Sequence, residues 1–161
     1  MLKQEPKHGN IRRDMMEEAV LKQKISRLIF PVALLFPMVL MTANLAYDEL
    51  WSLIYFSELP VTQILTDLAL PNNHPLNTFF LKILSFISLD TVFLRLPSFI
   101  CGAFIPVLCG ELAYKWSKRN RIGSLVAAAL LAMLSVPLAV YCGQARGYAM
   151  QIFFLLLCIR G

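Results

Sequence analysis

The chain of 161 residues is strongly apolar: 58% of the residues are hydrophobic, 16% are charged, and the mean hydropathy is +0.63. This apolar content exceeds what the core of a soluble domain absorbs, so the composition indicates a membrane protein. The net charge of +5 comes from Lys and Arg residues beside apolar runs, and no separate basic stripe with interleaved aromatic residues indicates a nucleic-acid partner.

The N-terminal part is predicted to be a cytosolic arm followed by a first membrane span. Residues 1–27 carry charges of both signs and no apolar run, whereas Leu28–Ala46 has no charge over 19 residues. A span needs roughly 20 apolar residues. A signal-peptide core is the competing interpretation, but the preceding segment is long and contains acids, and the apolar run is longer than such cores. Pro31 and Pro37 are expected to kink this span.

The segment after this span predicts two amphipathic helices lying in the membrane interface. The first has a small apolar stripe between Pro60 and Pro71, formed by Val61, Ile64, Leu65 and Leu68. The second, within Leu76–Leu94, has apolar residues at helical spacing on one side and polar residues on the other. That pattern suits an interfacial helix better than a span, which would leave almost no turn before Arg95.

Two further spans are predicted at Leu96–Tyr114 and Ile122–Tyr141, and a short apolar run begins at Tyr148. The loop between the two spans is basic, so the positive-inside rule places it and the N-terminus in the cytosol. The fold class expected is all-α, a polytopic membrane helical bundle with three full spans and a partial fourth. The short last run favours a truncated piece of a longer protein.

The cysteines, at positions 101, 109, 142 and 158, have no Cys-x-x-Cys spacing, so they indicate neither a zinc site nor a disulfide framework. We expect small packing residues. The topology places Cys142 at the outer surface, and Cys101 and Cys109 inside the second span.

Three polar groups share the outer face in this topology. Asp48 and Glu49 follow the first span in "YDELW", where a partly desolvated carboxylate could act as a general base or metal ligand; an acidic pair at an aromatic interface belt is the simpler interpretation. The turn "PNNHPLN" offers polar side chains between two prolines that could bind a phosphate, a metal or a sugar hydroxyl. Its members are Asn72, Asn73, His74 and Asn77.

The third group lies in "YCGQARGYAM". An arginine on the outer face is not explained by topology, and a guanidinium binds phosphate in a bidentate geometry that lysine does not reproduce. Arg95 at the start of the second span is similar, although snorkelling also explains it. The candidate residues for phosphate binding are Arg146, Arg95, Gln144 and Tyr148.

These motifs in this order resemble the N-terminal part of GT-C type glycosyltransferases, in particular bacterial protein O-mannosyltransferases and lipid A aminoarabinose transferases. The likeness covers residues from about 28 to 161 and consists of "DE" after the first span, the His-Pro-Leu turn, "RLPSFICG" and "ARGYA". The turn departs from the common double proline. The further spans and the soluble C-terminal region expected of such enzymes do not occur in these 161 residues.

The resemblance implies inverting transfer of a sugar from a polyprenyl-phosphate donor to a hydroxyl of a glycan, lipid or protein acceptor, outside the bacterial inner membrane. Asp48 would be the base, Glu49 the adjacent acid, His74 a residue of the donor or metal site, and Arg146 the ligand of the carrier phosphate. Asn73 and Asn77 would help to bind substrate.

A divalent metal is compatible with the sequence, but no dense carboxylate cluster demands one. The 161 residues alone are expected to be inactive. The alternatives are a non-enzymatic membrane subunit, an inactive truncated remnant and a transporter. A transporter would place ionisable residues within its spans, where only Glu111 could qualify.

Overall fold

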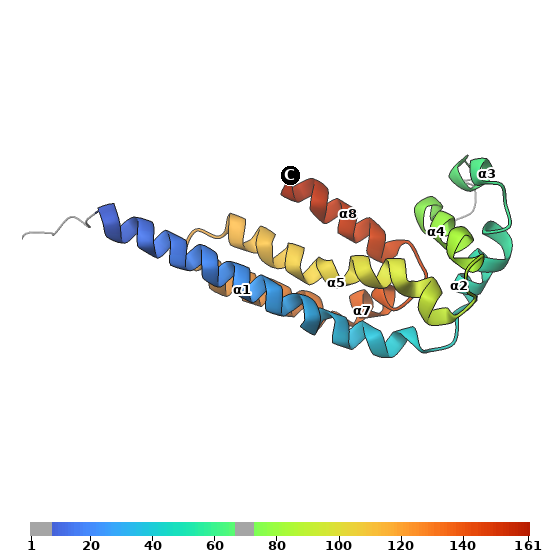
Figure 1. Ribbon diagram of the computed structural model, residues 1–161, viewed down its shortest axis with the longest axis horizontal. Helices are drawn as coiled ribbons and strands as arrows, with labels where there is room; N and C mark the ends of the chain where they lie inside the picture. The colour runs from blue at the N-terminus through green and yellow to red at the C-terminus, as the bar shows by residue number, and fades with distance from the viewer. Residues whose placement is uncertain (1–7, 67–72) are drawn as a thin grey trace, which may run out of the picture.

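The structure, a computed structural model, describes residues 8–66 and 73–161. These residues form helices joined by short loops, with no strand among them. The two longest helices, α1 (His8–Met41) and α5 (Thr91–Trp116), run side by side in opposite directions along the molecule (Figure 1). The all-α prediction is confirmed for this part of the chain. Leu68 and Asn72, named above, lie outside the described residues.

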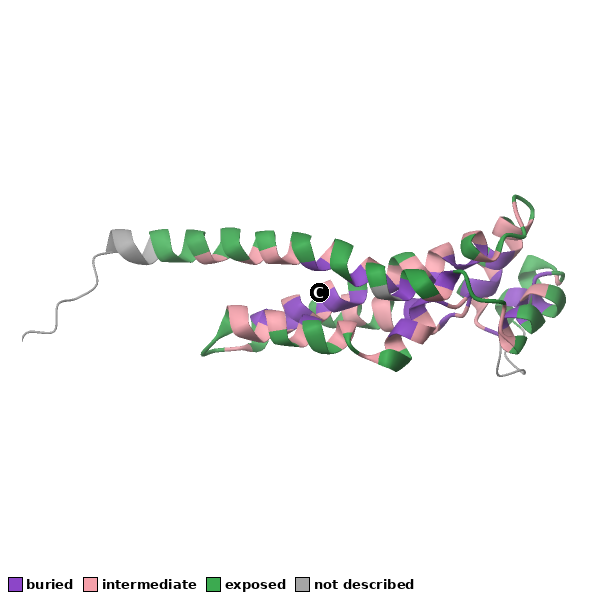
Figure 2. Ribbon diagram, turned by 90° about the horizontal axis from the view of Figure 1, so that it is seen from below, coloured by how far each residue is buried: buried purple, intermediate pink, exposed green. Residues whose placement is uncertain are grey.

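Helix α1 joins the charged arm to the first apolar run without a break. It is 34 residues long and contains both Pro31 and Pro37. The helix therefore begins about five turns before the predicted span, because the arm is rich in good helix formers such as Lys, Glu and Met. Its first turns extend beyond the other helices, and residues 13–17 are exposed (Figure 2).

Helix α5 is the centre of the bundle, as the second predicted span. It packs against α1, α4 (Pro75–Ser85), α6 (Arg121–Met133), α7 (Val136–Cys142) and α8 (Tyr148–Arg160). Asp90 caps its N-terminus, since the carboxylate accepts hydrogen bonds from the backbone N–H groups of Val92 and Phe93 at 2.9 and 3.3 Å. The helix is long and apolar enough to cross a membrane.

The third predicted span is broken rather than continuous. Helices α6 and α7 meet at an angle of 67°, across a break at Leu134 and Ser135. Ser135 caps α7, and Pro137 stands in its first turn, where the missing N–H leaves no helical bond unmade. The span predicted at Ile122–Tyr141 is therefore a bent pair of helices, because a cap and a proline restart the helix.

The short helices gather at one end of the bundle (Figure 1). They are α2 (Tyr47–Trp51), the π-helix η1 (Ser52–Phe56), α3 (Val61–Thr66) and α4. In α4 the polar side faces inward: Asn77 and Thr78 are buried, whereas Leu76 and Ile83 on the apolar stripe are each 43% exposed. The apolar stripe of α4 is therefore free to contact lipid, as expected for a helix that lies in the membrane interface.

Two helices, or three if the bent α6–α7 pair counts as one span, are long and apolar enough to cross a membrane, and α8 is shorter. Many large apolar side chains on α1 and α5 are exposed, such as Leu35 at 65% and Ile100 at 51%. Such exposure is costly in water and ordinary in lipid. The described residues are therefore all-helical or loop, and two or three of their helices could cross a membrane.

Cys142 does not lie at an accessible surface, contrary to the prediction. It is 2% exposed and packs against α5 at Gly102. A Cβ atom at Gly102 would stand 2.6 Å from Cys142 Cβ and 3.3 Å from its Cα. The prediction failed because the α6–α7 break turns α7 across α5, which buries the end of the apolar run. Cys101 and Cys109 are partly buried and Cys158 is exposed.

This close crossing predicts that Gly102→Ala destabilises the protein, because the added methyl group overlaps Cys142. We expect the free energy of unfolding in detergent to fall by about 1–3 kcal/mol, the usual cost of overpacking. Cys142→Gly in the same background should restore much of the loss. An unchanged midpoint in Gly102→Ala would contradict the α5–α7 contact.

Candidate functional site

A fully buried ion pair joins α2 to α5. Arg95 Nη2 lies 2.7 Å from Glu49 Oε2, and Arg95 Nε donates to Glu49 Oε1 at 2.9 Å. Both residues are only 1% exposed. This is the bidentate arrangement that guanidinium and carboxylate groups favour.

The rest of the Arg95 guanidinium binds the end of α1. Its remaining N–H groups donate to four backbone carbonyl groups at 2.7–3.0 Å, those of Leu40, Met41, Ala43 and Asn44. The last carbonyl groups of a helix have no partner within it, so Arg95 supplies the missing donors. Every N–H direction of Arg95 is thus used by a protein acceptor, so a donor phosphate at Arg95, as the sequence predicts, would have to displace one of them.

Glu49 is equally occupied. Its carboxylate also accepts hydrogen bonds from the backbone N–H groups of Ala46 at 2.8 Å and Ala145 at 2.5 Å. Burial raises the pKa of Glu49, but the hydrogen bonds from Arg95, Ala46 and Ala145 outweigh it, so the pKa lies below its ordinary value. A buried, ionised and fully bonded carboxylate is a poor base, so these contacts are those of a structural residue, and the catalytic role of Glu49 stays a prediction.

The turn between α7 and α8 is held from three sides. Besides the bond from its N–H to Glu49, Ala145 accepts a hydrogen bond at its carbonyl from Asn77 Nδ2 at 2.9 Å. The next carbonyl, that of Arg146, accepts one from Ser98 Oγ at 2.8 Å. Side chains from α2, α4 and α5 therefore fix the backbone from which the Arg146 side chain projects.

Arg146 and Asp48 form a second ion pair, which is less buried than the first. Arg146 Nη1 lies 2.9 Å from Asp48 Oδ2, and the two side chains are 15% and 38% exposed. Arg146 Nη2 donates to the Tyr148 hydroxyl at 3.2 Å, and the guanidinium lies 4.7 Å from the centre of that ring. The tertiary structure thus brings Asp48 next to Arg146 and Tyr148, which follow it about 100 positions later in the sequence.

His74 completes this group, at the N-terminus of α4. Its ring centre lies 4.7 Å from that of Tyr148, and its Nδ1 lies 3.2 Å from Gln151 Nε2. Its Nε2 is buried and has no hydrogen-bond partner among the described residues. Burial and the nearby Arg146 charge lower the pKa of His74, so the ring is neutral at pH 7.

The close approach of His74 to the α7–α8 turn requires a glycine there. A Cβ atom at Gly147 would stand 2.5 Å from His74 Cβ and 2.7 Å from its Cγ. Beside this contact lies a cavity of about 220 Å³. Its polar wall contains His74 and Gln151, and its apolar wall contains Met150 and Phe154.

The other predicted residues have positioning roles or lie beside the group. Asn73 is buried, and its Nδ2 donates to the Ile64 carbonyl at 3.0 Å while its Oδ1 accepts from Thr78 Oγ1 at 3.1 Å, which ties α3 to α4. Asn77 lines the cavity and holds the turn. Gln144 is partly buried in the same turn.

Sequence reasoning missed Gln151 and Ser98. Gln151 is an amide in an otherwise apolar run, and that signal could have identified it. Ser98 has no comparable signal. Within the described ranges, no three His, Cys, Asp or Glu side chains gather in a way that could hold a metal ion.

Comparisons of this chain with protein-family models, with curated proteins and with solved structures find no match. The fold and the site define a helical protein with two or three helices long and apolar enough to cross a membrane, and with Asp48, Arg146, Tyr148 and His74 grouped at one end of the bundle.

The buried pair predicts a large asymmetry between two Glu→Gln substitutions. Glu49→Gln leaves Arg95 as an uncompensated buried charge, so we expect the free energy of unfolding to fall by about 3–5 kcal/mol. Glu17→Gln removes a partner of Arg13 at an exposed i,i+4 pair and should change little. Chemical unfolding of both variants in the same detergent compares them; similar stabilities would contradict the structural role of Glu49.

The lowered pKa of His74 predicts a pH dependence of stability. Because the folded pKa lies below the ordinary 6.5, the unfolded chain binds the proton first as pH falls. The stabilisation is therefore complete above about pH 6.5 and is lost as pH falls from there through the folded value. Thermal unfolding across this range should show that slope in the wild type and in His8→Gln, and His74→Gln should flatten it. An equal slope in His74→Gln would show that another group is responsible.

Proposed function

We propose that the Asp48–Arg146 site binds the phosphate of a polyprenyl-phosphate sugar and transfers the sugar to an acceptor hydroxyl. The observation that carries the proposal is the Arg146–Asp48 pair itself, at 2.9 Å and partly exposed, in the same group as His74, which lines a cavity with one apolar wall. It sets a cation suited to phosphate next to a carboxylate suited to proton abstraction. The sequence resemblance to GT-C type glycosyltransferases supports the same reaction.

The phosphate would bind between Arg146, Tyr148 and His74. Arg146 supplies the positive charge, and the Tyr148 hydroxyl lies within hydrogen-bond reach of it. Gln151 Nε2 is an amide donor, so its contact with Nδ1 places the proton of a neutral His74 on Nε2. That Nε2–H is the buried group without a partner, and a phosphate oxygen is an acceptor that would satisfy it.

The cavity beside His74 suits the first part of the isoprenoid chain. Met150 and Phe154 extend along α8 from the polar group towards the apolar part of the bundle. An isoprenoid there would keep its phosphate at Arg146 and its hydrocarbon in lipid. A soluble sugar nucleotide would make no use of this apolar wall.

In the proposed reaction Asp48 is the base. The donor phosphate competes with Asp48 for the Arg146 guanidinium, which releases the carboxylate to accept the proton of the acceptor hydroxyl. The hydroxyl oxygen attacks the anomeric carbon from the side opposite the phosphate, and the bond from this carbon to the phosphate oxygen breaks with inversion. The phosphate leaves with the bonding electron pair, and Arg146 stabilises its charge. The acceptor would be a hydroxyl of a glycan, a lipid or a protein.

The proposal includes an orientation. Basic residues flank the end of α5 and the start of α6, and others precede the apolar part of α1. The positive-inside rule then favours a cytosolic N-terminus, with the Asp48–Arg146 site on the outer face of a bacterial inner membrane. The short helices α2–α4, with their exposed apolar residues, would lie in the outer interface.

Arg146 and Asp48 should have opposite effects on donor binding. Arg146→Gln removes the phosphate ligand, and Arg146→Lys loses its planar fork, so both should weaken binding of a polyprenyl phosphate, the former by about tenfold or more. Asp48→Asn removes the competing anion and should leave binding unchanged or tighter. Where transfer is measured, Asp48→Asn should lower kcat by about 10² or more.

Glu58→Gln is the matched control, because Glu58 is an exposed acid at the same end of the molecule. It should change neither binding nor transfer. Isothermal titration of the detergent-solubilised chain with a short-chain polyprenyl phosphate measures the binding. Equal affinity of wild type and Arg146→Gln would refute the site, and a weakened Asp48→Asn would refute the competition between Asp48 and phosphate.

A further inference from the structure

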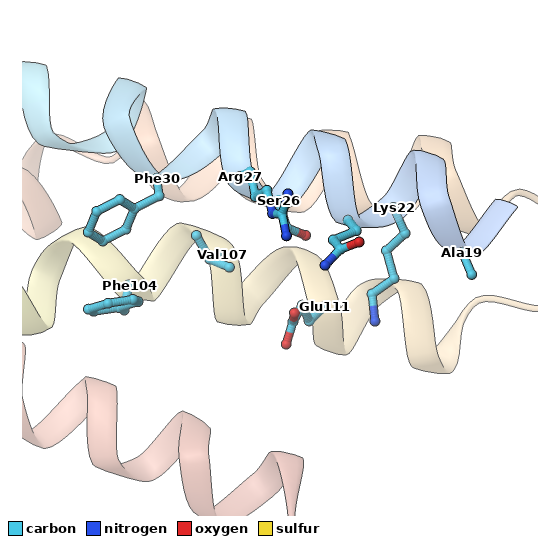
Figure 3. A pocket seen from close by; sticks show the side chains of 9 residues that line it. Ala19, Lys22, Ser26, Arg27, Phe30, Phe104, Val107 and Glu111 are labelled. Atoms are coloured by element: carbon cyan, nitrogen blue, oxygen red, sulfur yellow. The ribbon is translucent and has the colours of Figure 1, made fainter. Parts of the chain in front are cut away.

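A second cavity lies at the other end of the bundle from the Asp48–Arg146 site, between α1 and α5. Its volume is about 580 Å³. Figure 3 shows its lining graded along the helices, with Phe30 and Phe104 at one end and Lys22 and Glu111 towards the other. None of its residues belongs to the site proposed above.

The polar end of this cavity carries an excess of positive charge. Lys22 and Arg27 line it from α1, and Lys22 Nζ lies 4.8 Å from the centre of the Tyr114 ring. Glu111 is its acidic member, and Arg160 Nη2 already neutralises that carboxylate at 3.0 Å. The two α1 cations therefore remain in excess, which favours an anion.

The wall also contains a hydroxyl that lacks a partner. Ser26 Oγ is buried and makes no hydrogen bond with the described residues, although Ser26 lines the cavity. A buried hydroxyl without a partner is destabilising, and a ligand oxygen would supply the missing hydrogen bond. The hydroxyl lies next to Arg27 in the sequence, so one oxygen-rich group could reach both.

The other end of the cavity is aromatic. The ring centres of Phe30 and Phe104 lie 4.6 Å apart, and Phe153 from α8 lies 6.0 Å from Phe104. Phe104 is still 39% exposed. An alkyl chain can therefore lie against these rings and continue into the surrounding lipid.

The level of this cavity along the helices matches a membrane boundary. Arg27 is the last charged residue before the uncharged part of α1, and Glu111 lies one turn before Lys115 in the last turn of the antiparallel helix α5. Arg27 on α1 and Glu111 on α5 thus mark the same level of the bundle, and apolar residues follow on both helices towards the Asp48–Arg146 site. Basic cavities between helices at this level suit anionic lipid headgroups.

We propose that the α1–α5 cavity binds an anionic phospholipid from the leaflet at the basic end of the bundle. The phosphate lies at Lys22, Ser26 and Arg27, and an acyl chain lies over Phe30 and Phe104. The lipid completes the contact between α1 and α5, and so it stabilises the helix pair on which the bundle depends. This binding is independent of the function proposed for the Asp48–Arg146 site.

The test compares lipids and charge variants of the detergent-solubilised full chain. Phosphatidylglycerol should bind more tightly than phosphatidylcholine by native mass spectrometry, and should raise the melting temperature. Lys22→Gln with Arg27→Gln should weaken phosphatidylglycerol binding by about tenfold or more, since each basic residue near an anionic lipid surface contributes roughly a factor of five. Lys118→Gln with Arg119→Gln removes the same charge from the exposed loop after α5 and should leave binding unchanged.

A second variant tests the apolar end. Val107→Phe keeps every charge but fills the cavity that Val107 lines, so it should also reduce retention of phosphatidylglycerol. Circular dichroism confirms that each variant is folded; if the double charge variant does not fold, Val107→Phe decides. Equal binding of the two lipids, equal losses in both charge variants, full retention in Val107→Phe, or binding of soluble glycerol phosphate as strong as that of the lipid would each overturn the proposal.

Discussion

The buried Glu49–Arg95 pair is the interaction on which the rest of the structure depends. Glu49 and Arg95 together hold the end of α1, the start of α2, the first part of α5 and the α7–α8 turn. A buried ion pair is not by itself a source of great stability, because desolvation offsets much of the attraction. Here the Glu49 carboxylate and the Arg95 guanidinium use all their hydrogen-bonding directions. The pair therefore specifies one arrangement of the four segments, because a different arrangement would leave a buried charge unpaired.

The candidate site follows from this arrangement. Glu49 fixes the backbone at Ala145, so Arg146 projects beside Asp48, the residue that precedes Glu49 in α2. The two neighbouring acids therefore differ in role. Glu49 is buried and stabilises the fold, whereas Asp48 is partly exposed and accessible to a ligand. The same division separates the two arginines, since Arg95 is saturated by protein groups and Arg146 lies where a phosphate can reach it.

The two proposed ligands are both amphiphiles with a phosphate, but they occupy opposite ends of the bundle. The polyprenyl phosphate would meet a single cation, a neutral histidine and a carboxylate, which together can carry out group transfer. The phospholipid would meet two cations and no free base, which can only hold it. The difference arises from residues on α2 and on the α7–α8 turn, which supply Asp48 and Arg146 at one end and have no counterpart at the other.

The sequence by itself determined the apolar helices and the chain order of the polar motifs, and the topology inferred from it placed Asp48, His74 and Arg146 on one face. Those features depend on hydropathy, helical periodicity and residue chemistry, which are local. Only the tertiary structure decided that Glu49 and Arg95 are structural, that α6 and α7 are bent apart, and that Cys142 is buried. Each of these depends on which groups meet across distant segments. The sequence around Glu49 does not show that an arginine 46 positions later donates hydrogen bonds to its carboxylate. Burial of Glu49 and Arg95, rather than their residue types, separated these two residues from the partly exposed Asp48 and Arg146.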